Sequence, residues 1–186
     1  MGRDRLETGI QLSADLNYRA YNKTKLTNTP MTLLTETTDQ NFLLEYVKDY
    51  CNAITQNYLN YHKRCLERNL DQERGDIEKS FAQQQLDEIA NGTANLMKFR
   101  FEVGRKYYKI IQQEFDTFRD RNEWRDGSVH SFVGKEKSVL GNVYKPASWR
   151  APHTKYVRFS FCEPTDLRKL LDPNFVDWAG GYLYLR

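Results

Sequence analysis

The sequence has few features that mark a membrane or secreted protein. Its longest purely apolar runs are only a few residues, whereas a helix that crosses a bilayer needs ~20. The N-terminal segment begins with basic residues but lacks the apolar stretch of a secretory signal. Position 6 is Leu6, where N-myristoylation at Gly2 requires Ser or Thr. We therefore expect no membrane span.

Cysteine is also scarce, with 3 in 186 residues. Cys51 and Cys65 lie on one predicted helix, and fourteen residues of helix separate them by ~21 Å. A disulfide cannot form over that distance. The cysteines are therefore predicted to be reduced, in the cytoplasm or another reducing intracellular compartment.

Residues that could hold a metal are sparse. His62 and Cys65 are three residues apart on one helix face. A structural zinc site needs four ligands, and His130, His153 and Cys162 supply no second pair at ligand spacing. We expect no metal and no cofactor.

Catalytic motifs are missing as well. The chain has no glycine-rich phosphate loop and no nucleophile elbow. Four acids occur near the C-terminus, where paired carboxylates could perform acid–base chemistry, but helix starts and turns explain them more simply. They are Glu163, Asp166, Asp172 and Asp177. The sequence thus predicts no catalytic residue, and we expect a protein that is not an enzyme.

Aromatic residues are abundant, at 13% of the chain. Among them are 12 Tyr, a residue typical of half-buried surfaces such as subunit contacts. The net charge of +3 is too small to indicate a nucleic-acid-binding protein by itself. Composition therefore favours an assembly protein.

The segment 86–121 carries apolar residues at alternating steps of four and three. Such spacing places them on one face of an α-helix. They form a predicted helix-packing seam of Met97, Phe101, Gly104, Tyr108, Ile111, Phe115 and Phe118. Whether this seam packs within one chain or between chains is left open.

The N-terminal two thirds of the chain are expected to contain an arm and a helical part. Residues 1–38 are expected to form an extended arm with a short helix after Ser13. Residues 39–125 are expected to form a long helical hairpin or bundle, whose first helix Asp39 caps. The apolar stripe of this first helix recurs at steps of four and three and holds Leu43, Val47, Tyr50, Ile54, Tyr58, Tyr61 and Cys65. At Asn91-Gly92-Thr93 the helix either ends or continues, and the register of the seam favours continuity with a kink at Gly92.

Residues 126–186 are rich in Gly and Pro and lose the helical periodicity. They are expected to form a small β-containing segment packed on the helices, either an antiparallel sheet or an irregular wrap, with one short helix over 165–171. The expected strands are the short alternating segments 128–133, 155–161 and 181–186. The predicted fold class is mostly α (α+β), with two or three long amphipathic helices followed by this small irregular or β part.

The stretch 128–158 is the best candidate for binding nucleic acid. It holds six Lys or Arg and one acid, a net charge of +5, with aromatic residues interleaved. Rings of this kind stack on bases while cations neutralise phosphates. The alternative is a proline-rich surface loop docked by its tryptophan. The candidate contacts are Lys145, Trp149, Arg150, Lys155, Tyr156 and Arg158.

Together these features favour a non-enzymatic helical assembly or adaptor subunit that acts through protein–protein contacts, as a homo- or hetero-oligomer. The alternative hypothesis is a nucleic-acid-binding protein, such as a coat or packaging protein, that uses the basic aromatic loop.

Overall fold

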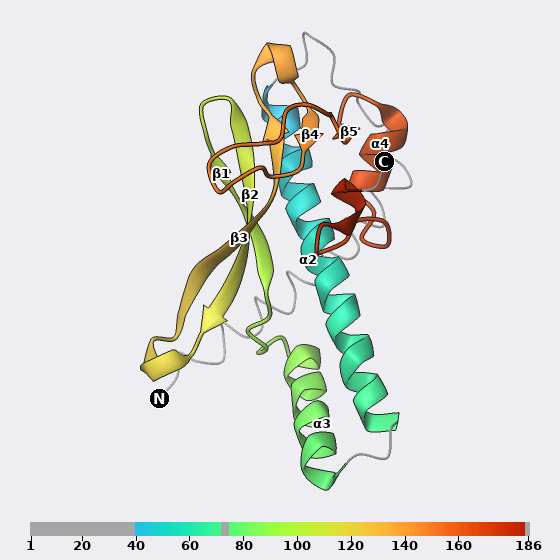
Figure 1. Ribbon diagram of the computed structural model, residues 1–186. Helices are drawn as coiled ribbons and strands as arrows, with labels where there is room; N and C mark the ends of the chain where they lie inside the picture. The colour runs from blue at the N-terminus through green and yellow to red at the C-terminus, as the bar shows by residue number, and fades with distance from the viewer. Residues whose placement is uncertain (1–39, 72–74, 185–186) are drawn as a thin grey trace, which may run out of the picture.

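The computed structural model describes residues 40–71 and 75–184. The expected arm at 1–38 and the Asp39 cap lie outside these residues. The fold is α+β: a five-stranded antiparallel sheet packs against a long helix, α2 (Gln40–Asp71). A C-terminal segment packs on the opposite side of α2 (Figure 1).

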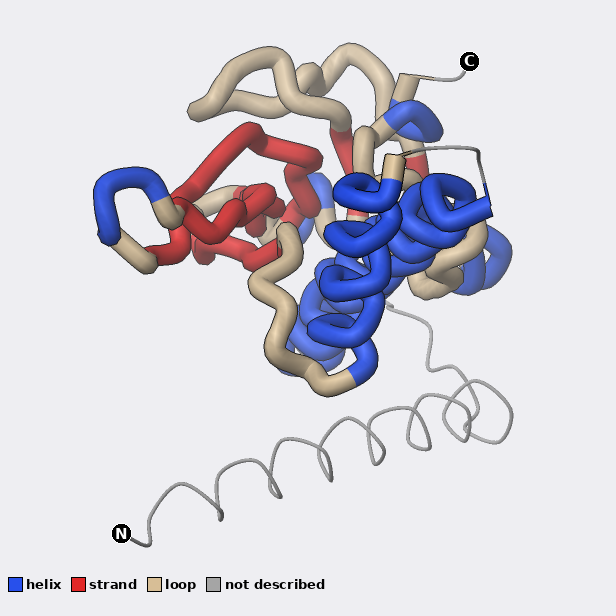
Figure 2. Tube along the Cα trace, turned by 90° about the horizontal axis from the view of Figure 1, so that it is seen from below, coloured by secondary structure: helices blue, strands red, loops and turns tan. Residues whose placement is uncertain are grey.

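Helix α2 follows the predicted apolar stripe over its first half. Leu43, Val47, Tyr50 and Ile54 are fully buried at helical spacing, as the sequence predicts. Its second half packs against α3 (Asp76–Ala90), so that α2 and α3 form a helical hairpin (Figure 1). Figure 2 shows these two helices on one side of the strands.

The predicted continuation of the helix through Asn91-Gly92-Thr93 is wrong. Helix α3 ends at Ala90, and Gly92 adopts a left-handed conformation with φ +71°. The amide of Thr93 donates to Glu88 O at 2.9 Å and that of Gly92 to Ile89 O at 3.3 Å. This pair of bonds is a Schellman motif, which ends a helix and favours glycine because the left-handed residue then has no Cβ to clash.

The predicted helical bundle over 39–125 is also wrong, because the sheet begins within that segment. The strands are β1 (Lys98–Val103), β2 (Tyr107–Asp116), β3 (Glu123–Gly134), β4 (Asn142–Tyr144) and β5 (Phe159–Ser160). They pair in chain order as an antiparallel meander. The β-containing part is therefore larger than the small C-terminal segment expected from the sequence.

The residues of the predicted seam are distributed over this sheet and its turns. Met97 precedes β1, Phe101 lies in β1, and Gly104 lies in the β1–β2 turn, where its amide donates to Tyr107 O at 2.9 Å. The other members of the set lie in β2 or at the tip of the β2–β3 hairpin. They are Tyr108, Ile111 and Phe115 in β2 and Phe118 at the tip. No helix-packing seam exists, and the buried members belong to the chain's own core.

Strand β3 contains irregularities that reorient its side chains. Between Ile110 and Ile111 in β2, the partner in β3 moves from Ser131 to Val129, so His130 has no partner of its own. An extra residue of this kind is a β-bulge, which bends a strand and redirects a side chain. The ring of His130 packs edge-on to Tyr50 of α2, at 6.2 Å between centroids.

The C-terminal predictions are partly correct. The expected strand over 128–133 forms the end of β3, and the expected short helix is α4 (Pro164–Leu170), which begins one residue earlier. Of the second expected strand only Phe159–Ser160 forms, and the third is instead a 3-10 turn, Gly181–Leu183. Gly180 before that turn has φ +76°, a left-handed conformation that no regular strand contains.

Candidate functional site

The segment 145–158 connects β4 to β5 and is an ordered loop. Pro146 and Pro152 form an isolated antiparallel bridge, and the His153 amide donates to Lys145 O at 2.9 Å. Beyond the bridge, the amides of Ala147 and Ser148 both donate to the carbonyl of Ala151. This bridge holds Trp149 and Arg150 at the tip of the loop.

The candidate nucleic-acid contacts fall into separate groups on this loop. Lys155 Nζ and the Arg158 guanidinium lie 5.2 Å and 5.5 Å from the centroid of the Tyr156 ring. Lys145 Nζ lies 4.6 Å from the ring of Tyr184. Arg150 is exposed. The structure therefore brings Lys155, Tyr156 and Arg158 together but places Lys145 elsewhere.

Trp149 contacts a residue that the sequence does not associate with it. Lys109 of β2 places its Nζ 4.7 Å from the Trp149 ring and 3.2 Å from Glu102 Oε2. A cation over an aromatic face is attracted by the ring quadrupole. Forty positions separate Lys109 from Trp149 in the chain, so the sequence alone does not indicate this pair. Sequence reasoning also misses His153, whose ring stacks on Tyr156 at 6.2 Å.

The tip of the β2–β3 hairpin is a second exposed element with unusual geometry. Arg119, Asp120 and Asn122 have φ of 55°, 59° and 47°, which non-glycine residues rarely adopt. Asp116 holds the tip by accepting the Phe118 amide at 2.8 Å. Phe118 is left 61% exposed. Such backbone strain is often found at functional positions, so this tip is a candidate contact surface.

A buried polar chain links α2, β3 and the C-terminal segment. His130 Nε2 lies 3.1 Å from the carbonyl oxygen of Asp177, so this nitrogen carries the proton and donates. His130 Nδ1 then accepts from Ser131 Oγ at 3.1 Å, and Ser131 accepts from Tyr50. Tyr50 is also hydrogen-bonded to Tyr182. These bond directions are those of a neutral imidazole, whose Nδ1 has a free lone pair.

Burial controls the titration of this chain. Desolvation lowers the pKa of His130 from 6.5 to about 4 and raises the pKa of Tyr50 and Tyr182 above their usual value. All these groups are neutral near pH 7, and Ser131 is fully buried with them. The chain therefore joins α2, β3 and the C-terminal segment through uncharged groups.

Three of the four acidic side chains near the C-terminus accept hydrogen bonds from backbone amides. Asp166 accepts the Ser160 amide at 3.0 Å, and Asp172 accepts the Asn174 amide at 2.8 Å. Asp177 accepts the amides of Ala179 and Gly181. Glu163 is exposed. Asp166 lies in the first turn of α4, as the sequence favours, and Asp172 lies in the turn before Pro173.

Cysteine and histidine do not cluster. Cys51, Cys65 and Cys162 are free, and burial raises the pKa of the Cys51 thiol to about 12. His62 stacks on Tyr58 at 5.7 Å between centroids. Among residues 40–71 and 75–184, no group of three or more His, Cys, Asp or Glu could hold a metal ion.

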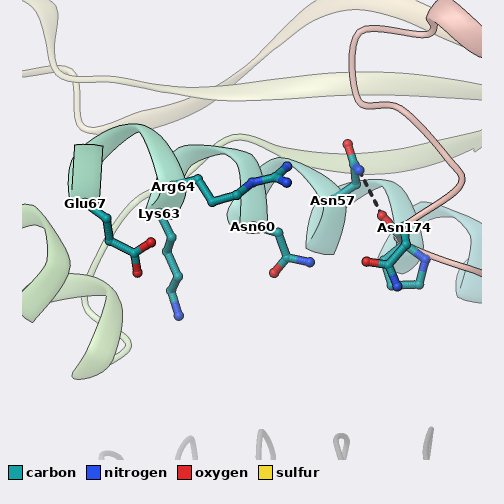
Figure 3. A pocket seen from close by; sticks show the side chains of 7 residues that line it. Asn57, Asn60, Lys63, Arg64, Glu67 and Asn174 are labelled. Atoms are coloured by element: carbon teal, nitrogen blue, oxygen red, sulfur yellow. Dashed lines mark hydrogen bonds between the residues drawn. The ribbon is translucent and has the colours of Figure 1, made fainter. Parts of the chain in front are cut away.

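A shallow polar groove of about 350 Å³ runs along the second half of α2 (Figure 3). Lys63, Arg64 and Glu67 line one end of it, and the turn at Pro173–Asn174 closes the other. Its lining is charged and open, unlike the mostly apolar, enclosed pockets that hold small molecules.

Asn57, at the closed end of this groove, joins α2 to the C-terminal segment. Its Nδ2 donates to Pro173 O at 2.8 Å (Figure 3). Its Oδ1 accepts the Trp178 amide at 3.0 Å. Asn57→Ala should lower the free energy of unfolding by about 1–3 kcal/mol, because two backbone groups lose their partner.

Urea denaturation measures this loss, and Asn60→Ala is the matched control. Asn60 lies one turn away on the same helix and accepts a side-chain bond from Gln56. The control should lose less than about 1 kcal/mol, as is usual for partly exposed sites. Equal losses at the two positions would contradict the role given to Asn57.

Residues 26–185 match the model of a family of unknown function, DUF7717. The chain belongs to this family. No curated protein and no solved structure matches it. In the part of the chain that the structure describes, no helix is both long and apolar enough to cross a membrane.

Proposed function

We propose that this protein is a non-enzymatic subunit of a protein assembly and acts through protein–protein contacts. The observation that carries the proposal is the exposure of large apolar side chains on its projecting elements. Ile77 and Phe81 of α3 are 85% and 60% exposed, and Phe118 projects from the β2–β3 tip. Exposed apolar side chains that cluster on one element mark interaction sites. The α2–α3 hairpin and the β2–β3 hairpin, which carry these side chains, both extend below the core in Figure 1.

The same proposal includes a reducing intracellular compartment. Its support is the set of three free cysteines, of which Cys51 is buried in the core beside Tyr50. Free thiols persist where thioredoxin and glutathione keep them reduced.

Light scattering on nuclease-treated and untreated protein, with absorbance ratios recorded, tests the proposal. We expect a mass that is a multiple of 22.1 kDa in both samples, without nucleic-acid absorbance. A monomer at about 100 µM, where an interface with a Kd of ~10 µM is mostly occupied, would contradict it.

The second candidate function is binding of single-stranded nucleic acid by the loop 145–158. The loop carries four Lys or Arg and no acid, and its Trp149 and Tyr156 rings are 44% and 51% exposed. Exposed rings beside cations are the elements that stack bases and neutralise phosphates in sequence-tolerant binding.

Salt titrations of oligonucleotide binding test this candidate. Arg150→Gln with Lys155→Gln should flatten the log Kd against log salt slope by about one to two units, because each phosphate contact contributes nearly one. The control Arg64→Gln with Arg68→Gln removes two exposed cations of α2 and should leave the slope unchanged. Binding that is insensitive to salt, or none in about 50 mM salt, would remove this candidate.

A further inference from the structure

The outward face of α3 has a defined pattern of side chains. Ile77, Phe81, Gln84 and Glu88 follow one another at steps of four, three and four, so they form a single stripe. Ala82, the buried residue of α3, lies on the other side of the helix. The stripe is apolar at its start and acidic at its end.

The charge of α3 is strongly biased. The helix contains four acids, Asp76, Glu78, Asp87 and Glu88, and one cation, Lys79, a net charge of −3. Ile77 and Phe81 are therefore exposed apolar side chains within an acidic surface.

The loop 145–158 has the opposite character. Its net charge is +4, and its exposed rings, Trp149 and Tyr156, are of the kind that fill apolar surfaces at protein interfaces. Arg150 and Lys155 are exposed beside them. An acidic face with apolar side chains and a basic loop with aromatic rings are complementary in both charge and polarity.

These two surfaces lie at opposite ends of the molecule. In Figure 1, α3 is at the bottom and the loop between β4 and β5 is at the top, beside the first strands. One chain therefore cannot pair its own α3 with its own loop.

We propose that the outward face of α3 docks on the loop 145–158 of a second copy of this chain. The contact joins two different surfaces, so it closes as a two-fold dimer where both copies exchange it, or repeats from copy to copy in a ring or a filament. This inference rests on the proposed assembly function and names the partner and the two surfaces.

Two interface-blocked variants of the full-length chain test the pairing by sedimentation velocity. One carries Ile77→Ser and Phe81→Ser in α3, and the other carries Arg150→Glu and Lys155→Glu in the loop. Each alone should remain a monomer under conditions in which the wild type assembles. Mixed in equal amounts, they should form a dimer of twice 22.1 kDa that does not grow, because only one intact interface is left.

A variant with reversed charges on α3 provides a second, independent test of the pairing. Asp87→Lys with Glu88→Lys suits a helix C-terminus, so α3 should remain folded. Alone, this variant should need at least about tenfold more protein to assemble, because like charges then face each other. Mixed with the Arg150→Glu, Lys155→Glu variant, it should assemble at the wild-type concentration and to the wild-type size, since both kinds of contact are again complementary.

Val103→Ser, at the exposed end of β1, is the control and should assemble like the wild type. A wild type that assembles while either blocked variant assembles equally well would overturn the pairing and leave the assembly function standing. Blocked variants that stay monomeric when mixed would overturn it too. Assembly that disappears on nuclease treatment would assign the loop to nucleic acid, and a monomeric wild type would overturn both proposals.

Discussion

Phe161→Ala should lower the free energy of unfolding by about 3–5 kcal/mol, as large-to-small changes in a packed core do. Phe161 is fully buried between α2 and α4. Its ring stacks on Tyr46 at 6.2 Å and meets Tyr50 edge-on at 5.8 Å between centroids. Alanine would leave a cavity where the C-terminal segment joins α2, so urea denaturation should show an early transition.

Phe118→Ala is the matched control for this measurement. It makes the same chemical change at an exposed ring, whose contacts include Arg119 at 5.0 Å. We expect a change within about 0.5 kcal/mol, as is usual for surface positions. Similar losses from both variants would mean that Phe161 does not lie in the core.

Acidification should destabilise the protein through His130 by roughly 3 kcal/mol between pH 6.5 and pH 4. Above pH 6.5 the imidazole is neutral in both the folded and the unfolded chain. Between pH 6.5 and about 4 the unfolded chain binds a proton that the folded chain excludes, so stability falls as pH falls. Below about pH 4 the loss from this group is complete.

The difference between wild type and His130→Gln isolates this effect from carboxylates that titrate in the same range. Urea midpoints at several pH values should show a weaker acid loss in the variant. His62→Gln keeps the buried imidazole and should follow the wild type. An equal acid loss in wild type and His130→Gln would show that His130 is not buried as a neutral ring.

Some of the structure follows from local sequence alone. Helix α2 is long and its buried residues recur at helical spacing, and α4 is bounded by Pro164 and the Asp172-Pro173 turn. Such signals are local, because capping, proline and apolar periodicity act within a few residues. The basic aromatic loop is also visible in the sequence, since its charges and rings are close together along the chain.

The prediction of a helix-packing seam was wrong because apolar residues at alternating steps of four and three can also occur in segments that form strands. Phe99, Phe101 and Val103 also alternate with polar residues, a β pattern that the longer helical count obscured. Tyr107–Asp116 begins with two tyrosines and contains two isoleucines, which favour strands. Asn91-Gly92 supplied the local signal that the helix ends before this segment.

The sequence by itself determined α2, α4, the chemistry of the loop 145–158 and the small number of residues that could perform catalysis. Only the tertiary structure decided that Lys109 lies over Trp149, that a bulge turns His130 into the core, and that Ile77 and Phe81 face away from α2. These contacts join residues far apart in the chain or depend on strand register. Their energies arise from the packing of elements against one another, which local propensity does not specify.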